Sequence, residues 1–183
     1  MIALAALLAA CSVHPDHSLV AAIARAHSDG SPLVVRNVDW SNLDAQDEPL
    51  QVRSPASRTR AHRVLVDVLE AGGTAVAGLM PVRLAWLRRR NLPASRIFSP
   101  CDNVRVATAK LLALDRGCSS HGRPTSSARR SCVLRRYGKA TGLGALHIVA
   151  RIQLRSPDFA DWLRKTQLDG GHSSPRVARL EIR

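Results

Sequence analysis

The chain has few aromatic residues. Phe, Trp and Tyr together make up 3% of its 183 residues, whereas hydrophobic residues as a whole make up 45%. A buried core must therefore be built mainly from aliphatic side chains. This length predicts one domain of ordinary size, with enough apolar side chains to bury a core.

Acidic residues are also scarce. The chain has 14 Asp and Glu against 27 Lys and Arg, which gives a net charge of +13. A surface this basic attracts polyanions such as nucleic acid, anionic lipid or acidic cell-wall polymers. An arginine- and alanine-rich composition also arises in a GC-rich genome. No aromatic residues interleave with the runs Arg88–Arg90, Arg129–Arg130 and Arg135–Arg136, and no recognised nucleic-acid-binding motif is present. We therefore interpret these runs as solvated faces and do not expect nucleic acid as a partner.

The four cysteines lack the spacing of a zinc site. Cys11, Cys101, Cys118 and Cys132 form no Cys-x-x-Cys pair, and no histidine pair has zinc-finger spacing. We therefore expect no metal and no cofactor. The even count is compatible with disulfides in an oxidising compartment, and the sequence leaves their pairing open.

The first ten residues are apolar, but no Lys or Arg precedes the run, as it does in secretory signals. The run is too short to span a bilayer, so we expect no transmembrane span. Leu8-Ala9-Ala10-Cys11 resembles a lipoprotein cleavage box. Two interpretations of residues 1–10 stay open: a signal remnant, or the first helix of the domain, which we favour.

Local signals predict a mostly helical chain. Pro15 and Asp16 mark a helix start, and Gly30 and Pro32 mark its end. A second helix is expected over residues 57–71, where apolar residues recur on one face. Further helices are predicted over 84–90, from 100 onward, over 128–137, over 145–154 and from 156. Residues 35–55 are expected to form a loop or short strands, and 117–127 and 169–175 to form loops.

Five short segments carry a family resemblance. They are Cys-Ser-Val-His-Pro at Cys11–Pro15, Ala-Ile-Ala-Arg-Ala-His-Ser-Asp-Gly-Ser-Pro-Leu within Ala22–Val35, Gly-Leu-Met-Pro-Val at Gly78–Val82, Ile-Phe-Ser-Pro-Cys-Asp-Asn-Val-Arg at Ile97–Arg105, and Arg136-Tyr137. In this order they resemble landmarks of the lytic transglycosylases of type IV secretion and conjugation systems, which are soluble lytic transglycosylases with a lysozyme-like domain. The resemblance covers about residues 11–152.

The resemblance implies a mostly α (α+β, lysozyme-like) fold, a single small helical domain with a glycan-binding cleft. That domain would cover residues 11–155, followed by a C-terminal helix and flexible tail at 156–183. Peptidoglycan glycan strands would be the substrate, secretion-system components would be partners, and the location would be the periplasm or cell envelope. Family members use one acid/base, and the sugar's own hydroxyl attacks the anomeric carbon.

The chain departs from the family where the chemistry should be. His27 stands at the position of the family's catalytic glutamate, and Ser31, Pro81 and Arg83 also replace family residues. Glycoside cleavage needs a proton donor, but an imidazolium is repelled by the developing oxocarbenium ion, and burial lowers the pKa of histidine. We expect a lytic transglycosylase-like protein that is catalytically impaired. The alternatives are a non-catalytic peptidoglycan-binding or assembly protein on the same scaffold, and an arginine-rich nucleic-acid binder.

Six residues are candidates for the site. Asp29 is a spare acid two residues from His27, although a capping or turn role with Gly30 is its ordinary interpretation. Packing is the alternative role of Met80, and for Tyr137 the alternative is a core aromatic with its hydroxyl at the surface. The catalytic candidates are His27 and Asp29, and the substrate-binding candidates are Ser28, Met80, Arg83 and Tyr137.

Overall fold

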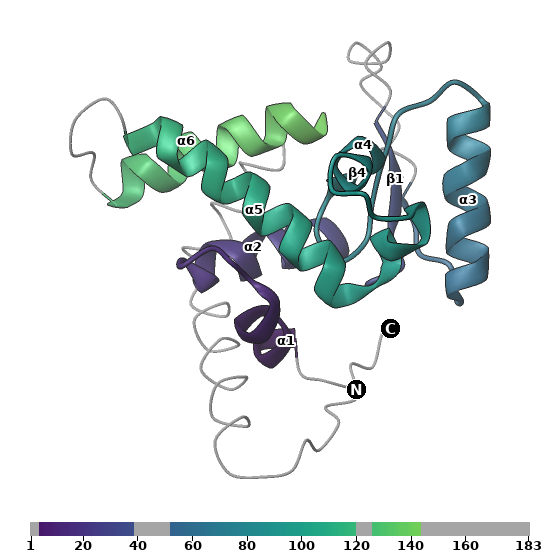
Figure 1. Ribbon diagram of the computed structural model, residues 1–183, viewed down its shortest axis with the longest axis horizontal. Coiled ribbons are helices and arrows are strands. Elements are labelled where there is room, and N and C mark those ends of the chain that lie inside the picture. The colour runs from purple at the N-terminus through teal and green to yellow at the C-terminus, as the bar shows by residue number, and fades with distance from the viewer. Residues whose placement is uncertain (1–3, 39–51, 120–125, 144–183) are drawn as a thin grey trace, which may run out of the picture.

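The computed structural model describes residues 4–38, 52–119 and 126–143 (Figure 1). These residues are mostly helical, as the sequence predicts. The α-helices are α1 (Leu4–Cys11), α2 (His17–Ser28), α3 (Arg58–Glu70), α4 (Leu84–Arg88), α5 (Pro100–Ser119) and α6 (Ser126–Thr141), and the 3-10 helix η2 covers Ala94–Phe98. The strands are β1 (Val35–Asn37), β2 (Val52–Arg53), β3 (Ala75–Ala77) and β4 (Val82–Arg83).

The strands form one small antiparallel sheet in the order β2-β1-β3-β4. Val35 of β1 pairs with Ala77 of β3, and Ala77 pairs with Val82 of β4. Helix α3 packs beside β1 and β3. In Figure 1, α5 crosses the middle of the molecule, with α6 at one end and the sheet and α3 at the other. Of the two alternatives for residues 35–55, a loop or short strands, β1 and β2 agree with short strands, and residues 39–51 lie outside the described residues.

Helix α2 is the central element of the core. Asp16 caps it by accepting a hydrogen bond from the Leu19 backbone N–H at 3.0 Å. The helix ends where Asp29 adopts the left-handed conformation, with φ of 48°. Both ends agree with the sequence prediction. Every residue from Leu19 to Ala24 is buried, so the helix is enclosed on all sides rather than along one stripe.

Residues 4–11 form helix α1. Leu8 lies in the core, and α1 packs against α2 and α5. A disulfide joins Cys11 at the end of α1 to Cys101 at the beginning of α5. None of the helices in the described part of the chain is long and apolar enough to cross a bilayer.

The predicted loop at 117–127 is wrong at both of its ends. Helix α5 continues to Ser119 and α6 begins at Ser126, so the predicted helix at 128–137 is longer at both ends. A disulfide between Cys118 and Cys132 joins the two helices. An ion pair between Asp115 and Arg129 joins them again, one helical turn from the disulfide. These bonds between α5 and α6 stabilise helical residues whose composition favours a loop. The helices predicted over 145–154 and from 156, and the loop at 169–175, lie outside the described residues.

Candidate functional site

The six predicted site residues lie on four segments of the fold. His27 and Ser28 end α2, and Asp29 caps it. Met80 lies in the turn between β3 and β4, Arg83 lies in β4, and Tyr137 lies in α6. The structure brings the end of α2, the turn at residues 78–81 and Tyr137 together through side-chain hydrogen bonds to the backbone of the turn.

Ser28 links the end of α2 to this turn. Its hydroxyl oxygen lies 2.8 Å from the carbonyl oxygen of Leu79 and 2.9 Å from that of Ala24, and it accepts a hydrogen bond from the Gly30 backbone N–H at 3.2 Å. Because Ser28 is buried and all of these contacts are to the backbone, its hydroxyl positions the turn.

Asn103, which was noted in the sequence only as part of a motif, holds the same turn from α5. Its Oδ1 accepts a hydrogen bond from the Met80 backbone N–H at 2.7 Å. Its Nδ2 donates to the carbonyl oxygens of Ala77 at 3.0 Å and Met80 at 3.2 Å. Gly78 adopts φ of 97°, and a Cβ at this position would overlap the Asn103 side chain. The close approach of Gly78 and Asn103 is a contact between distant residues, which the sequence does not show. Met80 itself is fully buried, in agreement with its packing alternative.

Tyr137 is a fully buried core residue. Its hydroxyl donates a hydrogen bond to the Pro81 carbonyl oxygen at 2.9 Å, and its ring centroid lies 5.8 Å from that of Trp86. Burial raises the pKa of the phenol well above its usual range. The alternative interpretation of Tyr137 as a core aromatic agrees with the structure, but its hydroxyl was wrongly expected at the surface, because the Pro81 carbonyl provides a buried acceptor.

Tyr137→Phe should lower the free energy of unfolding by about 1–2 kcal/mol, because the buried Pro81 carbonyl loses its hydrogen-bond donor. Urea unfolding at neutral pH measures this change. Arg135→Ala, which alters an exposed residue of the same helix, is the control and should change stability by less than about 0.5 kcal/mol. Equal stabilities of Tyr137→Phe and the wild type would show that the hydroxyl contributes nothing.

His27 is closed off from solvent. Its side chain is 1% exposed, and neither ring nitrogen makes a hydrogen bond of good geometry within the described structure. The Arg36 guanidinium donates to the His27 backbone carbonyl oxygen at 3.0 Å. Burial, reinforced by the nearby Arg36 charge and opposed weakly by the Gly78 backbone, lowers the pKa of His27 to about 3. The imidazole is therefore neutral at physiological pH and has no acidic proton to donate.

The candidates with charged side chains are Asp29 and Arg83. Asp29 is exposed at the helix cap, where its backbone N–H donates to the Arg25 carbonyl oxygen. This position agrees with the capping role that is the ordinary interpretation of Asp29. Arg83 is half-buried in β4, and its Nε makes no hydrogen bond to any described residue.

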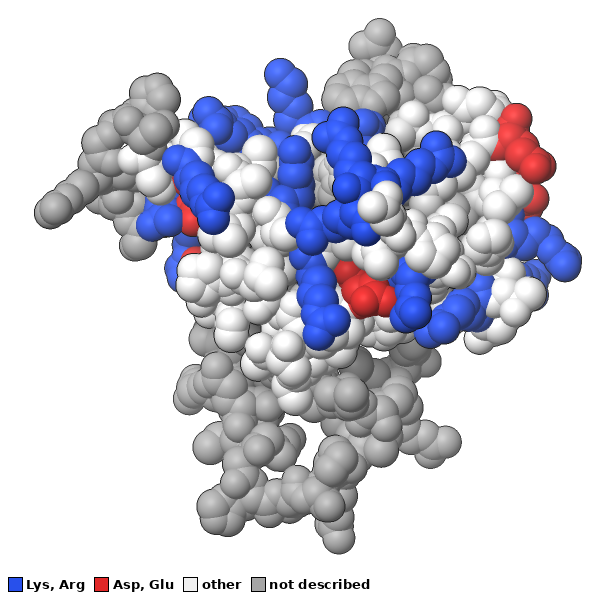
Figure 2. Space-filling view, viewed as in Figure 1, with Lys and Arg blue, Asp and Glu red and all other residues white. Residues whose placement is uncertain are grey.

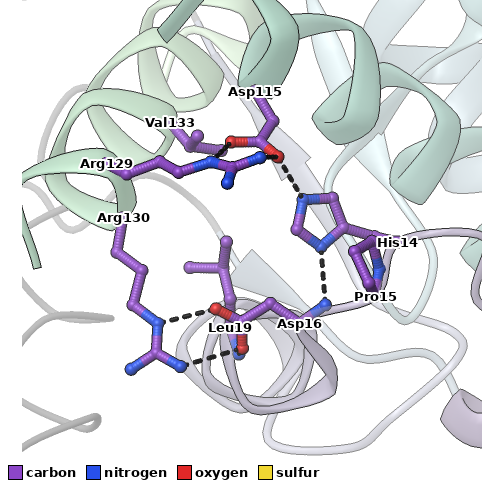
Figure 3. A pocket seen from close by; sticks show the side chains of 8 residues that line it. All are labelled: His14, Pro15, Asp16, Leu19, Asp115, Arg129, Arg130 and Val133. Atoms are coloured by element: carbon purple, nitrogen blue, oxygen red, sulfur yellow. Dashed lines mark hydrogen bonds and ion pairs between the residues drawn. The ribbon is translucent and has the colours of Figure 1, made fainter. Parts of the chain in front are cut away.

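A second candidate site, which the sequence analysis missed, lies at the other end of α2 (Figure 3). It is a pocket of about 550 Å³ between the beginning of α2, the end of α5 and α6. Arg129 pairs with Asp115 through two contacts of 2.5 Å, and Arg130 pairs with Asp16 at 2.6 and 3.1 Å. Its lining residues are His14, Pro15, Asp16, Leu19, Asp115, Arg129, Arg130 and Val133.

The electrostatics of this pocket are set by its ion pairs. Burial lowers the pKa of His14, although Asp115 and Asp16 act in the opposite direction. Burial alone would raise the pKa of Asp16, but its hydrogen bonds to Arg130 and the Leu19 backbone outweigh this and lower it. The interpretation of Arg129–Arg130 as a solvated face is therefore wrong in part, because both side chains bind carboxylates of other elements.

In the described part of the chain, no group of three or more His, Cys, Asp or Glu side chains is arranged to hold a metal ion. Comparison with protein-family models, curated proteins and solved structures finds no match for this chain.

Proposed function

We propose that this chain is a peptidoglycan-binding protein of the cell envelope, on a lysozyme-like scaffold related to the lytic transglycosylases of type IV secretion and conjugation systems, and without their lytic activity. The observation that carries the absence of lytic activity is the state of His27. It stands at the position where the family resemblance implies the acid, and it is buried and neutral.

The contacts between motif segments support the relationship. The segment at Cys11–Pro15 is joined to that at Ile97–Arg105 by the Cys11–Cys101 disulfide. The segment around Ser28 contacts Leu79 of the segment at Gly78–Val82. Asn103 and Tyr137 bind the same segment at Met80 and Pro81. Three of these segments, chosen only for their resemblance to one family, thus contact the turn at residues 78–81, and a fourth is joined to one of the three by the disulfide.

The chemistry supports binding without cleavage. Removal of a positioned general acid lowers a rate by roughly 10²–10⁴. A neutral imidazole cannot protonate a glycosidic oxygen, and the Asp29 carboxylate lies at the exposed helix cap rather than in the buried surroundings that adapt a carboxyl to this task. The two disulfides support an oxidising compartment such as the periplasm.

The charge distribution supports an acidic polymer as the partner. Figure 2 shows Lys and Arg spread over the face formed by α4 and α5, with acidic side chains at the edge formed by α3 and a small acidic patch among the basic side chains in the middle of the face. Among the described residues no aromatic side chain is exposed, and Trp86 and Tyr137 pack on each other. Without aromatic platforms to stack bases, this face is suited to long-range attraction of acidic cell-wall polymers rather than to binding of single-stranded nucleic acid.

Purified sacculi test the proposal. The wild-type protein should sediment with sacculi and release no anhydro-muropeptides, and His27→Glu should release none either, because position 27 is closed off from solvent and a carboxyl there does not reach a glycan strand. His17→Glu, an exposed substitution at the other end of the same helix, is the matched control and should release none. Release by the wild type would contradict the loss of activity, and failure to sediment with sacculi would contradict peptidoglycan binding.

A further inference from the structure

The pocket at the beginning of α2 presents guanidinium groups rather than carboxylates to the solvent. The Arg129 side chain is 48% exposed and its partner Asp115 is 5% exposed. The Arg130 side chain is 42% exposed and its partner Asp16 is 24% exposed. A molecule entering the pocket therefore meets the two arginines, while the two carboxylates hold them in place.

The pocket also contains a hydrogen-bond donor without a close acceptor. His14 is 3% exposed, and its Nδ1 accepts a hydrogen bond from the Asp16 backbone N–H at 3.1 Å. The neutral ring therefore carries its proton on Nε2. This nitrogen makes no hydrogen bond to the described residues, and it lies 3.7 Å from Asp115 Oδ2. In Figure 3 the His14 ring and the Arg129 guanidinium both lie next to the Asp115 carboxylate, at one side of the pocket.

A further feature favours a ligand with an apolar part. Pro15, Leu19 and Val133 give the pocket an apolar wall. The net charge of +13 attracts negative ligands to the whole molecule.

We propose that this pocket binds a small organic carboxylate that carries a short apolar group, of the kind found at the C-terminal end of a peptide. The ligand carboxylate is complementary to the Nη1 groups of Arg129 and Arg130, because Asp115 and Asp16 already accept from the Nε and Nη2 groups of these side chains. The apolar group packs on Leu19 and Val133. The volume of about 550 Å³ is within the usual range for small-ligand pockets. The inference does not depend on the proposed function, because the pocket and His27 lie at opposite ends of α2.

Titration of the full, isotope-labelled chain with N-acetyl-alanyl-alanine tests this site by NMR. The free acid should bind saturably at millimolar concentration or below, with the largest amide shifts near Leu19 and Val133. The matching carboxamide should bind at least tenfold more weakly, because it has lost the charge that the arginines recognise. Absence of saturable binding of the acid up to about 20 mM, well above the millimolar affinity of a weak ligand, would overturn the proposal. Equal binding of acid and amide would do the same.

Two variants and an anion competitor locate the site. Arg130→Gln should weaken binding of the acid at least tenfold, and Arg135→Gln, an exposed change on the same helix outside the pocket, should alter it less than twofold. Equal weakening by both variants would show a general charge effect and overturn the assignment. If Arg130→Gln does not fold, Arg129→Lys, which keeps the charge and loses the planar fork, takes its place with the same expectation. Displacement of the peptide by an equal concentration of inorganic phosphate would overturn the role of the apolar wall.

Discussion

Lowering the pH from 7 to 4.5 should reduce the free energy of unfolding by roughly 3 kcal/mol through His27 alone. Burial and Arg36 lower the pKa of this imidazole from 6.5 to about 3 in the folded protein. Below pH 6.5 the unfolded chain therefore binds a proton that the folded chain does not bind. The stability is complete above pH 6.5 and is lost by about 1.4 kcal/mol per pH unit as the pH falls toward 3.

The comparison of His27→Leu with the wild type isolates this effect, because other groups also titrate in this range. Urea unfolding at pH 7 and pH 4.5 gives the loss of stability for each protein, and the loss should be smaller in His27→Leu by roughly 3 kcal/mol. At pH 7 the variant should be at least as stable as the wild type, since two buried nitrogens without hydrogen bonds are removed. His17→Leu, at the exposed beginning of the helix, is the control. Parallel pH dependence of His27→Leu and the wild type would show that the imidazole is hydrated or hydrogen-bonded.

Removal of the Cys11–Cys101 disulfide should produce the largest loss of stability of any cysteine change. The bond closes a loop between residues 90 positions apart, and in the chain-entropy view such a cross-link stabilises the folded state by about 4–5 kcal/mol. This is a large part of the 5–15 kcal/mol typical of a whole domain. The paired variant Cys11→Ala/Cys101→Ala should also release α1 from α5, because Cys11 ends α1 and Cys101 lies in the first turn of α5.

The second disulfide provides the matched control for this prediction. Cys118 and Cys132 are 14 positions apart, so Cys118→Ala/Cys132→Ala should reduce the free energy of unfolding by about 3 kcal/mol. Urea unfolding of both paired variants under non-reducing conditions gives the two losses. A loss from the long-range pair that is no larger than the loss from the local pair would contradict the loop-length argument.

Elements with strong local signals were predictable from the sequence. Helix α2 begins after Asp16 and ends at Asp29 because a capping side chain and a following glycine act within a few residues. Helix α3 likewise begins after Ser57, whose hydroxyl accepts a hydrogen bond from the Arg60 backbone N–H. Such signals depend on nearest neighbours and do not require knowledge of the fold.

Contacts between distant residues were not predictable in this way. The pairing of the four cysteines depends on which helices meet, and so does the continuation of α5 through residues 117–119. The pocket combines His14, Asp115 and Arg129 from three separate segments, none of which has a recognisable motif for a binding site. The sequence did place His27 at the last turn of its helix, but its complete burial follows from the elements packed around that turn.

The enclosure of α2 has a mechanical consequence. Twelve residues at 1.5 Å each form a rod about 18 Å long, and its middle is surrounded by core side chains. A rod held in this way moves as one body, since a shift of one end displaces the packed side chains along its length. The pocket at the beginning of α2 and the turn next to the end of α2 therefore keep a fixed relative position. A substitution near Leu19 should change the geometry around Ser28 even though the substituted residue does not contact Ser28.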